Sequence, residues 1–202
     1  GGDLLNQIMP SSLAARSLRI PFLGMYGACS TMSEGLLVGG MLTDGGYASP
    51  VLCTAGSHYA TAERQYRFPL EYGNQRTPAS QWTVTGAGAV LLAQADARQY
   101  GAPLARLTRG CIGRVVDLGV TDANNMGAAM APAAAATLCA YFDDTGDTPE
   151  QFDRIITGDL GYVGSRLLLE WSEKQGHPLP EDRMMDCGLT IYDPQQDSHA
   201  GG

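Results

Sequence analysis

The feature that most constrains the fold is the alternation of short apolar runs with segments whose apolar residues recur at helical spacing. Runs of strand length alternate with helix-like segments along most of the chain, and glycine and proline mark many of the boundaries. This alternation is typical of an α/β fold in which helices pack on a largely parallel sheet. Glycine is abundant, at 26 of 202 residues, which suits sharp turns and close packing.

Ten segments show a clear pattern. The predicted helices cover residues 3–18, 30–42, 130–142 and 164–174. The predicted strands cover residues 20–26, 49–55, 82–92, 105–118, 154–157 and 188–192. Pro10 is expected to interrupt or kink the first helix, because proline lacks a backbone N–H. Residues 58–81 are predicted to form a long polar and aromatic loop, and such loops in compact domains are usually functional.

The charge balance argues against polyanionic partners. The formal net charge is −8, and lysine and arginine do not cluster. Nucleic acid is therefore not expected as a partner, because neutralising phosphates requires grouped cations. No apolar run reaches the length of a membrane span, and no signal peptide is visible. We therefore expect a protein without a transmembrane segment.

The cysteine pattern separates one thiol from the rest. The five cysteines are widely spaced and form no CxxC pair, so neither a disulfide framework nor a metal site is predicted. Four of them are expected to pack as small apolar side chains: Cys53, Cys111, Cys139 and Cys187. Cys29 differs because an apolar run and a small-residue turn precede it and a predicted helix follows. The N–H groups and positive dipole end of a helix stabilise a thiolate or a bound anion.

The sequence Gly27-Ala28-Cys29-Ser30-Thr31 resembles the nucleophile elbow of thiolases and ketoacyl synthases. Longer segments are similar to the stage V sporulation protein AD family and cover nearly the whole chain: Gly2-Asp3-Leu4-Leu5-Asn6-Gln7, Ala62-Glu63-Arg64-Gln65-Tyr66-Arg67-Phe68-Pro69, Glu71-Tyr72-Gly73, Gln81-Trp82-Thr83-Val84-Thr85-Gly86-Ala87-Gly88-Ala89 and Met126-Gly127-Ala128-Ala129-Met130-Ala131-Pro132-Ala133. The resemblance implies a thiolase-like layered fold of two similar α/β halves. It also implies binding of dipicolinic acid for uptake into the developing spore, together with membrane proteins of the same operon.

The resemblance also predicts the domain organisation. Residues 1–104 are expected to be the later part of the first half, and residues 105–202 the early part of the second, with both ends truncated. Two equivalent turns would then be Gly2-Asp3-Leu4 and Gly158-Asp159-Leu160. The protein is expected at the cytoplasmic side of the spore inner membrane. It is also a possible homodimer, because the strand before the nucleophile often pairs across a two-fold axis in thiolase-like proteins.

Two functions remain open from the sequence. Type III ketoacyl synthases place a catalytic histidine at the turn that corresponds to residues 157–161, and this chain has Asp159 there instead. A carboxylate cannot stabilise a developing oxyanion, so a binding protein without a complete catalytic set is the first hypothesis. The alternative is an acyltransferase or condensing enzyme with Cys29 as its catalytic nucleophile.

The expected ligand site draws on both halves. Its predicted residues are Cys29, Ser30, Thr31, Ser57, His58, Asp159 and His199. No cofactor is predicted, although calcium could travel with dipicolinate and touch a carboxylate such as Asp44 or Asp159. His177 is expected to be a solvated loop residue, and the acidic group at residues 143–147 a solvated helix end.

Overall fold

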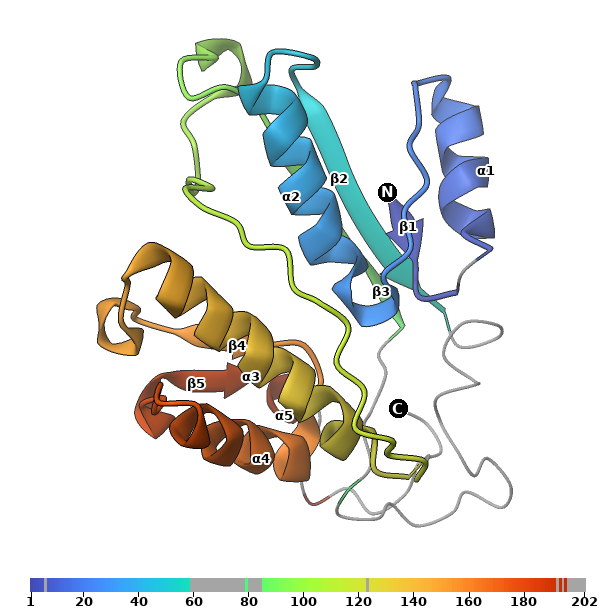
Figure 1. Ribbon diagram of the computed structural model, residues 1–202. Helices are drawn as coiled ribbons and strands as arrows, with labels where there is room; N and C mark the ends of the chain where they lie inside the picture. Colours follow the sequence, from blue (N-terminus) through green and yellow to red (C-terminus); the bar gives the residue numbers. More distant parts are fainter. Residues whose placement is uncertain are drawn as a thin grey trace, which may run out of the picture. The chain divides into compact units, whose positions relative to one another are not determined.

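The computed structural model describes residues 1–5, 7–58, 79, 85–122, 124–191, 193 and 195 (Figure 1). These residues fall into two compact units, the first built from residues 1–58 and 85–110 and the second from residues 111–195. Both units combine helices with strands, so the predicted α/β class is confirmed. The thiolase-like arrangement of duplicated halves stays a prediction.

The first unit is built on a three-stranded sheet. Its strands β1 (Gly2–Asp3), β2 (Val51–Ser57) and β3 (Gly86–Leu92) lie in the order β1-β2-β3. β1 runs parallel to β2, with Gly2 opposite Ala55, whereas β3 runs antiparallel to β2. Within this sheet, the expectation of parallel strands therefore holds for β1 and β2, and β3 departs from it.

Helix α2 (Thr31–Asp44) packs against β2 and confirms the helix predicted for residues 30–42 (Figure 1). Small residues on its inner face allow the close approach. A Cβ atom on Gly39 would meet the Cys53 sulfur at 2.6 Å. The same thiol, which is buried, donates a hydrogen bond to the carbonyl oxygen of Gly35 at 3.2 Å. Glycine at these positions therefore sets the distance between helix and sheet.

The first predicted helix is shorter than expected. Helix α1 spans Met9–Leu18, and Pro10 lies in its first turn rather than at a kink. Proline, which lacks a backbone N–H, fits there because the first N–H groups of a helix have no carbonyl acceptor within the helix. Asp3, which the sequence assigned to the helix, forms β1 together with Gly2 instead.

Two predicted strands are not formed in the described part of the chain. In residues 20–26, Met25 alone makes a bridge, parallel to Gly2. Residues 105–118 form no strand, although part of this extended segment packs on α2. Leu107 lies against Gly40, where a Cβ atom would meet it at 2.8 Å. Apolar residues in this segment are thus used for contact with a helix.

The described part of the second unit contains two strands and three α-helices. They are α3 (Met126–Thr145), β4 (Ile155–Thr157), α4 (Gly161–Lys174), β5 (Met184–Asp186) and α5 (Cys187–Ile191). The predicted helices at 130–142 and 164–174 and the strand at 154–157 are therefore confirmed. The predicted strand at 188–192 is wrong, because the strand lies earlier and parallel to β4. Four short 3-10 helices complete the described elements: Ala28–Ser30, Arg98–Tyr100, Pro149–Gln151 and Glu181–Arg183.

The core of this unit lies mainly between α3 and α4, which run side by side (Figure 1). Its buried members come from both helices and from the segments around them: Ala131, Ala135, Phe142, Ile155, Leu160, Leu168 and Leu179. The closest approach of the helices is at Gly164. A Cβ atom there would meet the Cα atom of Gly127 at 2.8 Å, so glycine is required for this spacing.

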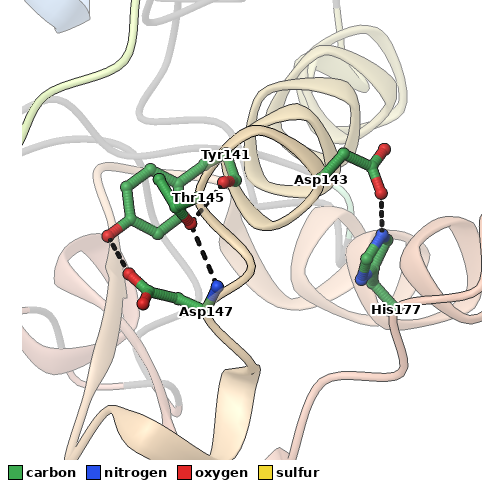
Figure 2. A network of polar contacts seen from close by, with 5 residues as sticks. All are labelled: Tyr141, Asp143, Thr145, Asp147 and His177. Carbon is green, nitrogen blue, oxygen red and sulfur yellow. Dashed lines mark hydrogen bonds and ion pairs between the residues drawn. The ribbon is translucent and has the colours of Figure 1, made fainter.

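Figure 2 shows the end of α3, where the sequence predicted solvated side chains. His177 Nε2 lies 2.8 Å from Asp143 Oδ1, and its ring lies 5.5 Å from that of Phe142. On the same helix end, Tyr141 donates its hydroxyl hydrogen to Asp147 at 2.7 Å. The acidic helix end is solvated as predicted, since the Asp143 side chain is 69% exposed. The interpretation of His177 as a solvated loop residue needs correction, because its side chain is only 23% exposed and joins the loop after α4 to α3.

No helix in the described ranges is long and apolar enough to cross a membrane, in agreement with the sequence.

Replacing Gly164 by valine should destabilise the second unit. The branched side chain would collide with the backbone of Gly127, and overpacking of this kind costs about 1–3 kcal/mol of unfolding free energy. The matched control is Gly158→Val, since nothing lies within 4 Å of a Cβ atom at that position. Urea denaturation of both variants measures the difference. Equal stability of the two would contradict the close contact between α3 and α4.

Candidate functional site

Three segments of the first unit reach the same edge of its sheet. β1 ends at Asp3 and β2 at Ser57, and these two strands are parallel. The parallel bridge between Gly2 and Met25 brings a third segment to this edge, and that segment continues into the turn of Cys29. Ligands of open α/β sheets bind beyond the carboxyl ends of the strands. We call this edge, with Asp3, Ser57, His58 and residues 27–31, the carboxyl edge.

The turn around Cys29 has a strained backbone. Cys29 is exposed and lies in the 3-10 helix Ala28–Ser30, directly before α2. Ala28, immediately before it, has φ 48°, in the left-handed region that residues with a Cβ atom rarely adopt. Both the backbone N–H and the hydroxyl of Ser30 donate to the Gly27 carbonyl oxygen, at 2.9 and 2.7 Å. Cys29 is therefore presented on a sharp turn at a helix start.

Thr31 holds this turn from the inside. Its side chain is buried, with 1% of the residue surface exposed. The hydroxyl donates to the Ala28 carbonyl oxygen at 2.8 Å and accepts from the Gly27 N–H at 3.1 Å. A Cβ atom on Gly2 would meet Thr31 Cγ2 at 2.6 Å, so β1 lies directly against the start of α2. The Thr31 hydroxyl thus fixes the shape of the turn, while Cys29 and Ser30 lie on its exposed side.

A buried carboxylate supports His58 at the carboxyl edge. Asp3 has 2% of its side chain exposed, and its Oδ1 accepts a hydrogen bond from the Leu5 N–H at 3.1 Å. Its Oδ2 lies 3.5 Å from His58 Nε2, whose side chain is 34% exposed. The sequence predicted His58 as a site residue but missed Asp3. The signal for Asp3 was present in the repeated Gly-Asp-Leu tripeptide.

Asp159 lies in the second unit, in the turn after β4, and is half-buried. The neighbouring backbone is held by Asp186, the buried last residue of β5. Asp186 Oδ2 accepts from the Leu160 N–H at 2.8 Å and from the Thr157 hydroxyl at 2.7 Å. Gly188 lies so close to the Asp159 carboxylate that a Cβ atom would not fit. Sequence reasoning missed Asp186, while His199 lies outside the described residues.

The other cysteines differ in environment. Cys53 and Cys139 are buried, as expected for packing residues, and burial raises the pKa of both thiols. The charge of Asp143 raises the pKa of Cys139 further. Cys111 and Cys187 are half-buried. Within the described ranges, no group of three or more His, Cys, Asp and Glu side chains is placed to hold a metal ion.

A family model described as Stage V sporulation protein AD matches residues 1–202 of the chain. The chain belongs to this family. A curated relative, Stage V sporulation protein AD of Bacillus subtilis (strain 168), is 46% identical over 201 residues. That alignment covers all of this chain and 57% of the relative, so the chain spans little more than half of its length. The resemblance inferred from the sequence motifs is therefore confirmed, and the Stage V sporulation protein AD family is one of sporulation proteins.

Replacing Ala28 by glycine should stabilise the chain. Glycine adopts the left-handed conformation without the Cβ clash, which removes backbone strain from the folded state. The strain removed should exceed the extra conformational entropy that glycine loses on folding, for a net gain of about 0.5–1 kcal/mol in unfolding free energy. The matched control is Ala97→Gly, because Ala97 has φ −74° and gains no such relief. Thermal unfolding compares the two variants. A loss of stability in both would show that the turn at Ala28 is not strained.

Alkylation should separate the thiols by their exposure. Iodoacetamide should modify Cys29 first, because its side chain is exposed, and leave Cys53 and Cys139 unmodified in the folded protein. Their raised pKa reduces the reactive thiolate at any given pH, and burial blocks the reagent. Peptide mass spectrometry after short exposure measures the order. Repeating the reaction in denaturant should make all three react at similar rates.

Proposed function

We propose that this member of the Stage V sporulation protein AD family binds dipicolinic acid, alone or as its calcium chelate, for uptake into the developing spore. The observation that carries the proposal is the carboxyl edge of the first unit. There an exposed turn at the start of α2 lies at the same strand ends as Ser57 and His58. Strand ends beside a helix N-terminus form a common type of site for small anionic ligands.

The chemistry of the ligand suits the groups at this edge. Dipicolinate is a flat dianion whose two carboxylates flank a ring nitrogen. The positive end of the α2 dipole can stabilise one carboxylate, although the Thr31 N–H itself already donates to the Ala28 carbonyl oxygen. Ser57 and His58 supply a hydroxyl and an imidazole for the other, and Asp3 orients the imidazole from its buried side.

The second unit supports binding in preference to acyl transfer. Asp159 stands where the resemblance places a catalytic histidine, and Asp186 holds the backbone of the same turn. A carboxylate opposes negative charge on a reacting oxygen. It is, however, an oxygen ligand of the kind that calcium prefers.

One observation favours a second candidate function, acyl transfer with Cys29 as nucleophile. An exposed thiol at a helix start, next to a left-handed Ala28, has the arrangement that nucleophilic catalysis requires. Incubation with an acyl-coenzyme A followed by intact mass measurement tests it. An acyl adduct that is lost in Cys29→Ala would establish this function.

The partners we propose follow from the family. They are membrane proteins of the same sporulation operon, at the cytoplasmic side of the spore inner membrane, and a second copy of the chain. Residues 20–26 are proposed to form the homodimer contact, because they expose Ile20, Leu23 and Tyr26. Light scattering of the protein over a range of concentrations tests the dimer, and a constant monomer mass would exclude it.

Calorimetric titration with dipicolinate tests the main proposal directly. Measurements with and without calcium separate the free acid from the chelate. Binding in either condition supports the proposal, whereas its absence in both, with folding verified by circular dichroism, would refute it. A terephthalate titration is a suitable control, because that dicarboxylate is of similar size but has no ring nitrogen beside its carboxylates.

Cys29→Ala should weaken dipicolinate binding only mildly, whereas Cys29→Trp should abolish it. The backbone donors of the turn remain in the alanine variant, so the loss should be about 1 kcal/mol, or roughly five-fold in Kd. The indole of tryptophan would fill the space that the ligand needs. Calorimetry of both variants measures the effect. Complete loss of binding in a folded Cys29→Ala variant would show that the thiol itself is required.

A further inference from the structure

An acidic side chain lies against the turn that presents Cys29. Glu34 is in the first turn of α2 and is half-buried. Its Oε2 atom lies 2.8 Å from the position that a Cβ atom on Gly27 would occupy. Glycine at position 27 therefore leaves the space into which the carboxylate folds. The carboxylate is placed beside the backbone of the turn and does not extend away from it into solvent.

This position has opposite effects on the helix and on a ligand. A negative charge in the first turn stabilises a helix by compensating the positive end of its dipole. The same charge cancels part of the positive potential on which an anion at this end would depend. Asp3 adds a second carboxylate at the carboxyl edge, where it faces His58. The edge is therefore less favourable to anions than a helix start alone would be.

We propose that Glu34 sets the charge selectivity of the Cys29 turn, disfavouring ligands with net negative charge relative to neutral or cation-neutralised ones of the same shape. The inference rests on the proposed function in so far as this turn is the binding site. Glu34 acts through its field, at short range and without contact to a reacting atom. Its removal should consequently change discrimination by charge while leaving the turn and the thiol in place.

Two alkylating reagents of nearly equal size test this directly. Iodoacetamide is neutral and iodoacetate is an anion, and each reacts when the Cys29 thiolate attacks its carbon and iodide leaves. Any change in the amount of thiolate affects both rates equally. The ratio of the iodoacetate rate to the iodoacetamide rate therefore reports only how the electrostatic potential at Cys29 acts on the charged reagent. Glu34→Gln should raise this ratio roughly three- to ten-fold, as expected for two charges several ångströms apart near a protein surface.

The matched control is Asp96→Asn. Asp96 is an exposed acidic residue of the same unit, in the turn after β3. Gln94 of this segment donates to the Thr43 carbonyl oxygen at the opposite end of α2, at 3.4 Å. Removing the Asp96 charge should therefore leave the ratio unchanged. The ratio should also rise with salt concentration more steeply in the unsubstituted protein than in Glu34→Gln, because only the former has the Glu34 charge for salt to screen.

The outcomes separate the two proposals. A ratio that is unchanged in Glu34→Gln, or that rises equally in Asp96→Asn, overturns the role of Glu34, even if dipicolinate binds. A raised ratio in Glu34→Gln alone supports it, even if the dipicolinate titration fails. Should Glu34→Gln prove unfolded by circular dichroism, Glu34→Ala repeats the measurement, and an unchanged ratio in that variant overturns the inference.

Discussion

The arrangement of the first unit depends on the backbone of Gly2, which lies between two other segments. Gly2 pairs with Ala55 in β2 and makes a parallel bridge with Met25. A Cβ atom here would strike the Met25 carbonyl and come within 2.6 Å of the Thr31 side chain, so only glycine permits this approach. Through this packing the ends of β1 and β2 and the start of α2 reach one edge of the sheet.

Each unit has a buried aspartate at a strand end that accepts a hydrogen bond from the backbone of a nearby turn. In the first unit Asp3 accepts from the Leu5 N–H and faces His58. In the second, Asp186 accepts from the Leu160 N–H. A buried carboxylate is costly unless it receives hydrogen bonds, and backbone N–H groups in a turn supply them. The bonds that satisfy these carboxylates therefore also hold the turns in a defined conformation.

Local signals in the sequence predicted the helices well, and non-local pairing explains most of the errors. α2 ends where Asp44 is followed by glycines, and the apolar spacing before that point identified the helix. Residues 105–118 have strand-like composition, but a strand requires a partner, and no local pattern specifies one. For the site, the small-residue turn located Cys29 and the repeated Gly-Asp-Leu tripeptide marked Asp3. The pairing of Asp3 with His58 and the position of Glu34 depend on contacts that the sequence pattern does not reveal.

The balance of charge at the carboxyl edge bears on the choice between binding and catalysis. Acyl transfer needs an activated thiolate and hydrogen-bond donors at the developing oxyanion. Glu34 lies against the turn of Cys29, and a nearby carboxylate opposes negative charge that develops on a reacting oxygen. A ligand whose negative charge is neutralised by a bound cation is repelled much less by this carboxylate. A turn that keeps its donors while placing acids around them is better suited to holding such a ligand than to transferring an acyl group.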